Sequence, residues 1–256
     1  MASTVRRMPE FRAIRNDPKS ALRQELLFAF HILDLCGHPS GRGAHLTARL
    51  PGSDTFLFHI HNYGFGEVTP AHIHEADFEL NVLSGKDIDV NPTLHIHTRI
   101  YMARPDVTCI AHTHAKHVAA LSAIGQNIQP VTQSAARLFD DSVFFDEDDG
   151  VALGKEPGTL MAQALGARSA MVLKCHGLLA VGRSIPEAVL LANTMEENAE
   201  IQLLAMAASG GKLELPSPEG SRRSKEYLRS DRAITRSWAT WMRQLERERP
   251  AVLDMM

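Results

Sequence analysis

The chain has 256 residues, of which 44% are hydrophobic and 22% charged, and its net charge is −3. This length and composition suit a globular protein of one large or two small domains. The slightly negative charge excludes a strongly basic nucleic-acid binder, and no run approaches the roughly 18 apolar residues of a transmembrane helix. Three cysteines without a Cys-x-x-Cys pair indicate neither a disulfide framework nor a zinc finger, so we expect a cytoplasmic protein.

Three segments are predicted along the chain: an N-terminal arm over residues 1–14, one catalytic domain over residues 15–210, and a C-terminal helical extension over residues 211–256. Neither an internal repeat nor a linker rich in glycine, serine and proline divides the central segment. Trp238 and Trp241 lie three residues apart, on one face of a helical pattern. We expect this face to pack against the body of the protein or against another subunit.

The predicted elements alternate between helices and strands. Pro51, Gly52 and Asp54 lie between two strand-like runs and predict a hairpin, while Asn91 and Pro92 predict a helix cap and a first turn. The runs with helical periodicity are residues 21–36, 94–104, 117–125 and 185–208, and the strand-like runs are residues 44–50, 55–60, 106–112 and 169–174. This order predicts an α/β fold in which helices cover a sheet.

Histidine is concentrated in one part of the chain: nine of the 13 histidines lie between residues 59 and 117, and eight of these form His-x-His pairs. Two histidines at i and i+2 of a strand point to the same side and can bind one metal ion, whereas on a helix they point to different sides. One pair falls in a predicted helix, one lies in a turn-like stretch that suits a structural role, and one ends a strand and is geometrically possible. These pairs are, in that order, His95/His97, His72/His74 and His59/His61.

His112 and His114 make the most favourable pair, because they lie at the end of an apolar strand. His176 has the same context, just after another predicted strand and before Gly177. In α/β sheets, ligands gather at the carboxyl ends of strands. Three imidazoles that leave coordination positions open are typical of a catalytic ion, so we predict that these three histidines bind one divalent metal ion. The alternative is two unrelated polar strand ends.

The segment HIHTRIYMARPDVTCIAHTHAKHVAALSAIG, with KCHGL at residues 174–178, resembles the class II aldolase/adducin family. GAHLTARLPGSDTFLFH and FGEVTPAHIHEADFE match the N-terminal half of that family, so the likeness spans roughly residues 20–210. The resemblance implies an α/β/α sandwich around a central, largely antiparallel sheet, and a divalent ion held by His112, His114 and His176. It also implies a homotetramer with active sites between subunits.

Three departures from the sugar-phosphate aldolases of this family point to a different substrate. Those aldolases carry an acid/base glutamate at the position occupied here by Thr93, 19 residues before the first paired histidine of the metal site. They bind phosphate through a Gly-Asn pair, where this chain has Ala44-His45, and they use two serines where it has Asn91-Pro92. Threonine does not titrate near neutral pH, and proline offers no N–H to an anion. We therefore expect a substrate without a phosphate group.

A divalent ion without that glutamate still acts as a Lewis acid on a carbonyl group. Breaking a carbon–carbon bond beside the carbonyl leaves an enolate, which the ion stabilises. Decarboxylation needs no base to begin, so the loss of the glutamate favours it over aldol cleavage. We predict a metal-dependent carbon–carbon lyase, a decarboxylase of a small non-phosphorylated carboxylic acid such as an aromatic one, with zinc, manganese or iron as the ion. The alternatives are a non-haem iron(II) oxygenase on the same fold, an aldolase, and a non-catalytic, adducin-like binding or assembly protein.

The catalytic proton donor and the substrate-binding residues are predicted from the second helix and the first strand. His97 and Tyr101 are four residues apart and share a helix face, so we expect one of them to line the site as the donor. The alternative for both is packing at a seam between helix and sheet. By resemblance, His45, Arg49 and Thr93 occupy positions where the family binds its substrate. Arg49 can pair with a carboxylate, or it is simply an exposed strand residue.

Overall fold

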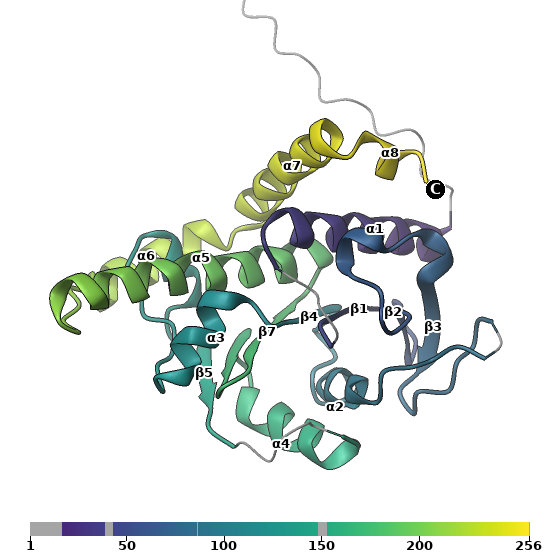
Figure 1. The fold of residues 1–256 in the computed structure, drawn as a ribbon, viewed down its shortest axis with the longest axis horizontal. Helices are drawn as coiled ribbons and strands as arrows, with labels where there is room; N and C mark the ends of the chain where they lie inside the picture. The colour runs from purple at the N-terminus through teal and green to yellow at the C-terminus, as the bar shows by residue number, and fades with distance from the viewer. Residues whose placement is uncertain (1–16, 39–42, 86, 148–152, 256) are drawn as a thin grey trace, which may run out of the picture.

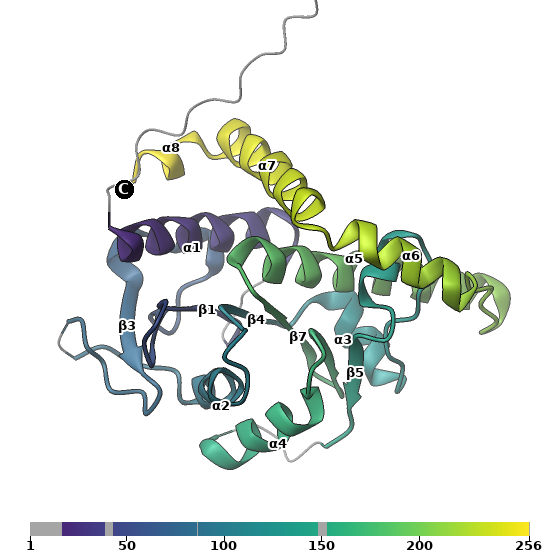
Figure 2. The ribbon, with the colours of Figure 1, turned by 180° about the vertical axis from the view of Figure 1, so that it is seen from behind.

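The computed structural model describes residues 17–38, 43–85, 87–147 and 153–255, so the arm predicted over residues 1–14 lies outside it. Within these ranges the chain forms three layers, a seven-stranded sheet with helices on both of its faces (Figures 1 and 2). This arrangement confirms the predicted α/β/α sandwich.

The sheet is mixed but largely antiparallel. Its strands are ordered β3-β2-β1-β4-β7-β6-β5, and every neighbouring pair is antiparallel except β5 and β6. The strands are β1 (His45–Arg49), β2 (Thr55–His59), β3 (Ile73–Asp77), β4 (Cys109–Thr113), β5 (Ser142–Phe145), β6 (Ala170–Leu173) and β7 (Gly177–Gly182). The two central neighbours, β4 and β7, are fully buried, as expected for strands covered on both faces.

The helices divide into two groups, each over its own hydrophobic core. Helices α1, α3, α5 and α7 contribute to the core on one face of the sheet, and α2 and α4 to the core on the other face (Figure 1). The α-helices are α1 (Pro18–Leu35), α2 (His95–Ala103), α3 (Lys116–Ala123), α4 (Lys155–Leu165), α5 (Ile185–Ser209), α6 (Pro218–Leu228), α7 (Asp231–Glu248) and α8 (Pro250–Leu253). Short 3-10 helices are η1 (Phe65–Glu67), η2 (Pro70–His72), η3 (Pro92–Leu94) and η4 (Ser134–Leu138).

Local capping signals set several of these boundaries. The side chain of Asn91 accepts a hydrogen bond from the backbone N–H of Thr93, which begins η3 and the adjoining α2. Ser184 caps α5 in the same way, and Gly210 ends it with a left-handed backbone at φ 66°. The predicted helix over residues 21–36 begins three residues earlier than expected, at Pro18, because Asp17 supplies the cap.

Four elements escaped the sequence patterns, namely β3, β5, α4 and β7. The turn-like stretch around His72 and His74 is a short 3-10 helix followed by β3, a strand at the edge of the sheet. Edge strands are exposed and often polar, so they lack the apolar run of a buried strand.

The predicted C-terminal helical run is interrupted at Ser230, which caps α7. Trp238 and Trp241 pack against the body of the protein, one of the two expected partners.

None of the helices in the described part of the chain combines the length and the apolar character needed to span a membrane.

Candidate metal centre

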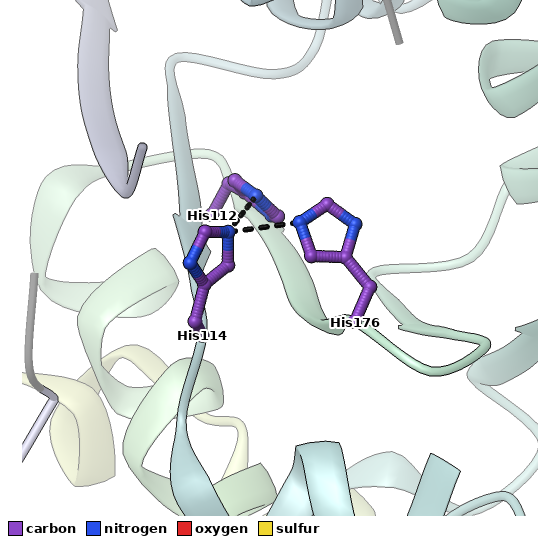
Figure 3. Close-up of side chains that lie close together, drawn as sticks. All are labelled: His112, His114 and His176. Atoms are coloured by element: carbon purple, nitrogen blue, oxygen red, sulfur yellow. Dashed lines mark hydrogen bonds between the residues drawn. The ribbon is translucent and has the colours of Figure 1, made fainter. Parts of the chain in front are cut away.

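The pairing of β4 with β7 brings the three predicted metal ligands together. His112 lies in β4, His114 follows its last residue, and His176 precedes β7 in the turn from β6 (Figure 3). Because β4 and β7 are antiparallel, with Thr113 opposite Leu178, the end of β4 lies beside the beginning of β7. The register of an antiparallel pair therefore assembles the site, and not a shared carboxyl edge of parallel strands.

Gly177 makes this close approach possible. A Cβ atom at this position would overlap the carbonyl oxygen of Thr113 and lie 3.0 Å from the Cα atom of His114. Any side chain there would push the two strands apart, so the residue after His176 has to be glycine. This is the physical reason for the His-Gly pair in the sequence.

The ligand nitrogens converge closely enough for one ion. The Nε2 atom of His114 lies 3.2 Å from Nε2 of His112 and 2.8 Å from Nε2 of His176. One ligand atom from each of the three side chains lies within 4.8 Å of the others. Bonds of about 2.0–2.1 Å to a tetrahedral ion hold imidazole nitrogens about 3.4 Å apart, so the two distances from His114 lie within about 0.6 Å of the value that an ion requires.

The protonation of the triad also suits a metal. His112 donates from Nδ1 to the carbonyl oxygen of Leu178 at 2.9 Å, which leaves the lone pair of Nε2 directed at the site. Burial lowers the pKa of His112 well below its usual value and also lowers the pKa of His114. Both imidazoles are therefore neutral at physiological pH, the form that binds metal ions. The donor set and its protonation fit a divalent ion.

A chain of hydrogen-bonded side chains adjoins the triad. His45 pairs with His112 across β1 and β4, and their ring centroids lie 4.8 Å apart. We call the connected group the polar chain: Asn91, Thr93, His45, His97, Thr47 and Tyr101. Its links are Asn91 Oδ1 to Thr93 Oγ1 (2.7 Å), Thr93 Oγ1 to His45 Nε2 (3.0 Å), His45 Nδ1 to His97 Nε2 (2.8 Å), His97 Nδ1 to Thr47 Oγ1 (2.7 Å) and Thr47 Oγ1 to Tyr101 Oη (2.8 Å).

His97 and Tyr101 share the face of α2 that packs on β1, as the spacing predicted. Both side chains are fully buried. The described partners of the Tyr101 hydroxyl are the Thr47 hydroxyl and, at 3.5 Å, the carbonyl oxygen of Thr108. The structure therefore places Tyr101 in the seam between helix and sheet and does not bring its hydroxyl to the triad.

Arg49 lies at the opposite end of β1 from His45. Its guanidinium donates to the carbonyl oxygens of Ser53 and Tyr101 and forms an ion pair with Asp54. The structure therefore does not bring Arg49 to the triad.

Thr47 is a member of the polar chain that sequence reasoning missed. Thr47 lies two residues from His45 and two residues from Arg49 along β1, and residues two apart in a strand face the same side. A threonine on the face that meets His97 was a usable signal, but only once β1 was known to lie beside α2.

The remaining histidine pairs are not assembled like the triad. His59 is buried and packs edge-on against Phe30, with ring centroids 4.7 Å apart. His74 hydrogen-bonds through Nδ1 to the carbonyl oxygen of Ser84 at 3.0 Å. Groups of three or more histidine, cysteine, aspartate or glutamate side chains could hold a metal ion if their ligand atoms lie close together. Among the described residues, the triad His112, His114 and His176 is the group that meets this condition.

The chain belongs to the class II aldolase and adducin family, because residues 24–203 match the sequence pattern of the family described as "Class II Aldolase and Adducin N-terminal domain". It is 30% identical to decarboxylase tropJ of Talaromyces stipitatus over 253 residues, covering 86% of this chain and 90% of that protein. It is 33% identical to a 4-hydroxy-3-prenylphenylpyruvate oxygenase/4-hydroxy-3-prenylbenzoate synthase of Streptomyces roseochromogenus, covering 62% of this chain and 57% of that protein. The structure of an L-fuculose 1-phosphate aldolase from Glaciozyma antarctica superposes with a TM-score of 0.83 at 25% identity, covering 94% of this chain and 96% of that one.

Proposed function

We propose that this protein is a metal-dependent decarboxylase of a small, non-phosphorylated carboxylic acid. One observation carries the proposal: the hydroxyl of Thr93, which by resemblance occupies the position of the aldolase glutamate, is engaged by Asn91 and His45 beside an intact histidine triad. The site therefore keeps the means to bind an ion and lacks the acid/base carboxylate. Similarity to decarboxylase tropJ supports the same reaction class.

In this proposal His112, His114 and His176 hold the ion, and burial keeps His112 and His114 neutral. When bound, a divalent ion supplies Lewis acidity that stabilises the negative charge developing on a carbonyl oxygen. The hydrogen bond from His112 to Leu178 fixes the ring and its tautomer, so this ligand is preorganised. The triad would thus hold the ion for the electrostatic part of the reaction with one of its three ligands already oriented.

The proton requirements of the reaction favour decarboxylation over aldol cleavage. Aldol cleavage must begin with removal of a proton from a hydroxyl group, whereas a carboxylate leaves as carbon dioxide without a base. Neither the Thr93 hydroxyl nor the Asn91 amide that it contacts can accept a proton at neutral pH. Pro92, beside them, has no N–H with which to bind a phosphate.

An iron(II) oxygenase is the second candidate, and one observation favours it. The Streptomyces relative is called an oxygenase and a synthase, and it is 33% identical to this chain over 159 residues. Three imidazoles suit iron as well as zinc or manganese, so the same triad serves both candidates.

Metal and oxygen dependence separate the candidates. The purified protein, loaded in turn with zinc, manganese or iron(II), is incubated with aromatic and aliphatic keto acids, with and without oxygen, and carbon dioxide is measured. Metal-dependent release without oxygen supports the decarboxylase, and release that requires both iron and oxygen supports the oxygenase. Cleavage of a sugar phosphate with no release from any acid would refute both.

Two variants control this experiment. His112→Ala removes a ligand and is expected to abolish release. Thr98→Val alters a buried threonine of α2 whose hydroxyl bonds only the His95 carbonyl among its described partners, and it is expected to leave activity within about twofold of the wild type.

A further inference from the structure

On the basis of the function proposed above, we propose that Asn91 and Thr93 are positioning residues that set the direction of the whole polar chain. They thereby hold His45 and His97 as Nε2–H tautomers and keep His45 from acting as a ligand or a base. The consequence is an ion site with three imidazole ligands and no fourth one.

The direction begins at the Asn91 amide. The backbone N–H of Thr93 donates to Oδ1 of Asn91 at 3.0 Å, so this atom is the amide oxygen and can only accept. The hydroxyl of Thr93 lies 2.7 Å from the same oxygen. Because a hydroxyl has one proton, that proton goes to Asn91, and Oγ1 of Thr93 is left to accept.

The two histidines follow from this first step. Since Oγ1 of Thr93 accepts, the proton in its 3.0 Å contact with His45 belongs to Nε2 of the histidine. A neutral imidazole carries one proton, so Nδ1 of His45 is bare and accepts from Nε2–H of His97 at 2.8 Å. His97 is then also an Nε2–H tautomer.

The far end of the polar chain completes the pattern. The bare Nδ1 of His97 accepts from the Thr47 hydroxyl at 2.7 Å, and Oγ1 of Thr47 accepts from the Tyr101 hydroxyl at 2.8 Å. Every donor therefore points the same way, from Tyr101 towards Asn91. No link carries two protons or none, which is the condition for a fully satisfied buried network.

The neutrality of His97 supports this assignment. Burial lowers the pKa of His97 well below the usual value, and the titratable group that acts on it is another histidine. Burial also raises the pKa of Tyr101, so its hydroxyl keeps the proton that it donates.

The same atoms allow one competing arrangement, in which every donor is reversed. The reversed chain would end with the Tyr101 hydroxyl donating to the carbonyl oxygen of Thr108, and it would leave Nε2 of His45 bare. That terminal contact is 3.5 Å long, at the limit of a hydrogen bond, whereas the Asn91 end is closed by bonds of 2.7 and 3.0 Å. The Asn91 end therefore decides the direction.

The direction matters because His45 is the neighbour of the metal ligand His112, with ring centroids 4.8 Å apart. In the observed direction Nε2 of His45 carries a proton and Nδ1 is occupied, so His45 has no lone pair to give. In the reversed direction Nε2 would be a bare nitrogen that accepts the Thr93 hydroxyl, and loss of that one hydrogen bond would free its lone pair for an ion or a substrate proton. Asn91 and Thr93 thus keep coordination positions open and keep a base away from the substrate.

Nuclear magnetic resonance of the zinc-loaded, full-length protein with 15N-labelled histidines tests the assignment, because protonated and bare ring nitrogens resonate far apart. The signals of His45 and His97 are identified by their loss in His45→Asn and His97→Asn. In the wild type at neutral pH we expect both as Nε2–H tautomers. A proton on Nδ1 of either ring overturns the proposal, and this measurement does not depend on the folding of Thr93 variants.

Variants of Thr93 test which end decides the direction. Thr93→Val removes the hydroxyl and is expected to move the proton from Nε2 to Nδ1 in both His45 and His97. Thr93→Ser keeps the hydroxyl and is expected to keep the wild-type tautomers, as is the control Thr98→Val. If His45 stays an Nε2–H tautomer in Thr93→Val, Thr93 does not position it. The tautomers are measured without substrate, so a failure of the decarboxylase assay leaves this result intact, and the reverse also holds.

Discussion

Arg229 lies away from the metal centre and links the end of α6 to α5 and to the residues just before β5 and β6. We expect its loss to destabilise the fold without altering the ion site. Arg229 is the residue that follows α6, and its guanidinium donates to Oε1 of Glu187 at 2.7 Å, to Oγ of Ser169 at 3.1 Å, and to Asp141. Glu187 is 2% exposed and Asp141 9% exposed. Arg229→Met keeps much of the side-chain volume but removes the cation from two buried carboxylates.

The expected magnitude follows from the partners that remain. Removing one member of a buried ion pair costs about 3–5 kcal/mol. The lower end applies, because Glu187 keeps bonds from the backbone N–H and Nε of Arg183 at 2.9 and 3.2 Å, and Asp141 keeps Lys225 at 3.7 Å. Burial acts to raise the pKa of Glu187, but the bonds from Arg229 and Arg183 outweigh it and hold the pKa below its usual value. We expect a loss of about 3 kcal/mol in the free energy of unfolding, or a melting temperature lower by about 6–12 °C.

Urea unfolding at pH 7 measures this loss. The matched control is Arg222→Met, which removes an exposed arginine of α6 that lies 3.9 Å from Asp140, and it should change the free energy by less than about 0.5 kcal/mol. The double variant Arg229→Met/Glu187→Gln should recover part of the loss, because the uncompensated charge is gone. A loss below about 1 kcal/mol in Arg229→Met, or an equal loss in the control, would refute the reasoning.

Acid is expected to weaken the fold, because burial lowers the pKa of His38 and His59 to about 4. The unfolded chain takes up these protons near pH 6.5, so the stabilisation is complete above that pH and is lost as the pH falls towards 4; an unchanged urea midpoint between pH 7 and pH 5 contradicts this. Gly177→Ala is expected to abolish zinc binding by forcing β4 and β7 apart, whereas Gly182→Ala, also crowded but at the other end of β7, should keep the metal. Elemental analysis decides, and one zinc per chain in Gly177→Ala contradicts the expectation. Light scattering tests the predicted homotetramer of 28.2-kDa chains, and a monomer at micromolar concentration contradicts it.

Features set by neighbouring residues were predictable from the sequence. His112 and His114 face one side because a strand repeats every two residues, and the helix caps at Asn91 and Ser184 depend on side chains within three positions. The same short-range rules correctly placed His97 and Tyr101 on one face of α2. They did not reveal β3, because an edge strand carries too few buried residues to leave an apolar pattern.

Features that depend on distant segments required the fold. Whether His176 meets His114 depends on the register of β7 against β4, and a register shift of one residue would turn either side chain to the other face. Arg49 matched a binding position by resemblance, yet four residues along an extended strand separate it from His45 by about 13 Å.

The sequence by itself therefore determined the ligand types and the like-facing histidine pair, because these are properties of single residues and of strand periodicity, whereas the position of Thr93 relative to the aldolase glutamate came from the family resemblance. The tertiary structure alone decided the convergence of the triad and the links of the polar chain. Thr47 on β1 and His97 on α2 are 50 positions apart, and a hydrogen bond of 2.7 Å between them exists only because a helix packs across that strand. Local periodicity places side chains to within a face, whereas hydrogen bonding requires tenths of an ångström, and only packing of the whole domain supplies that accuracy.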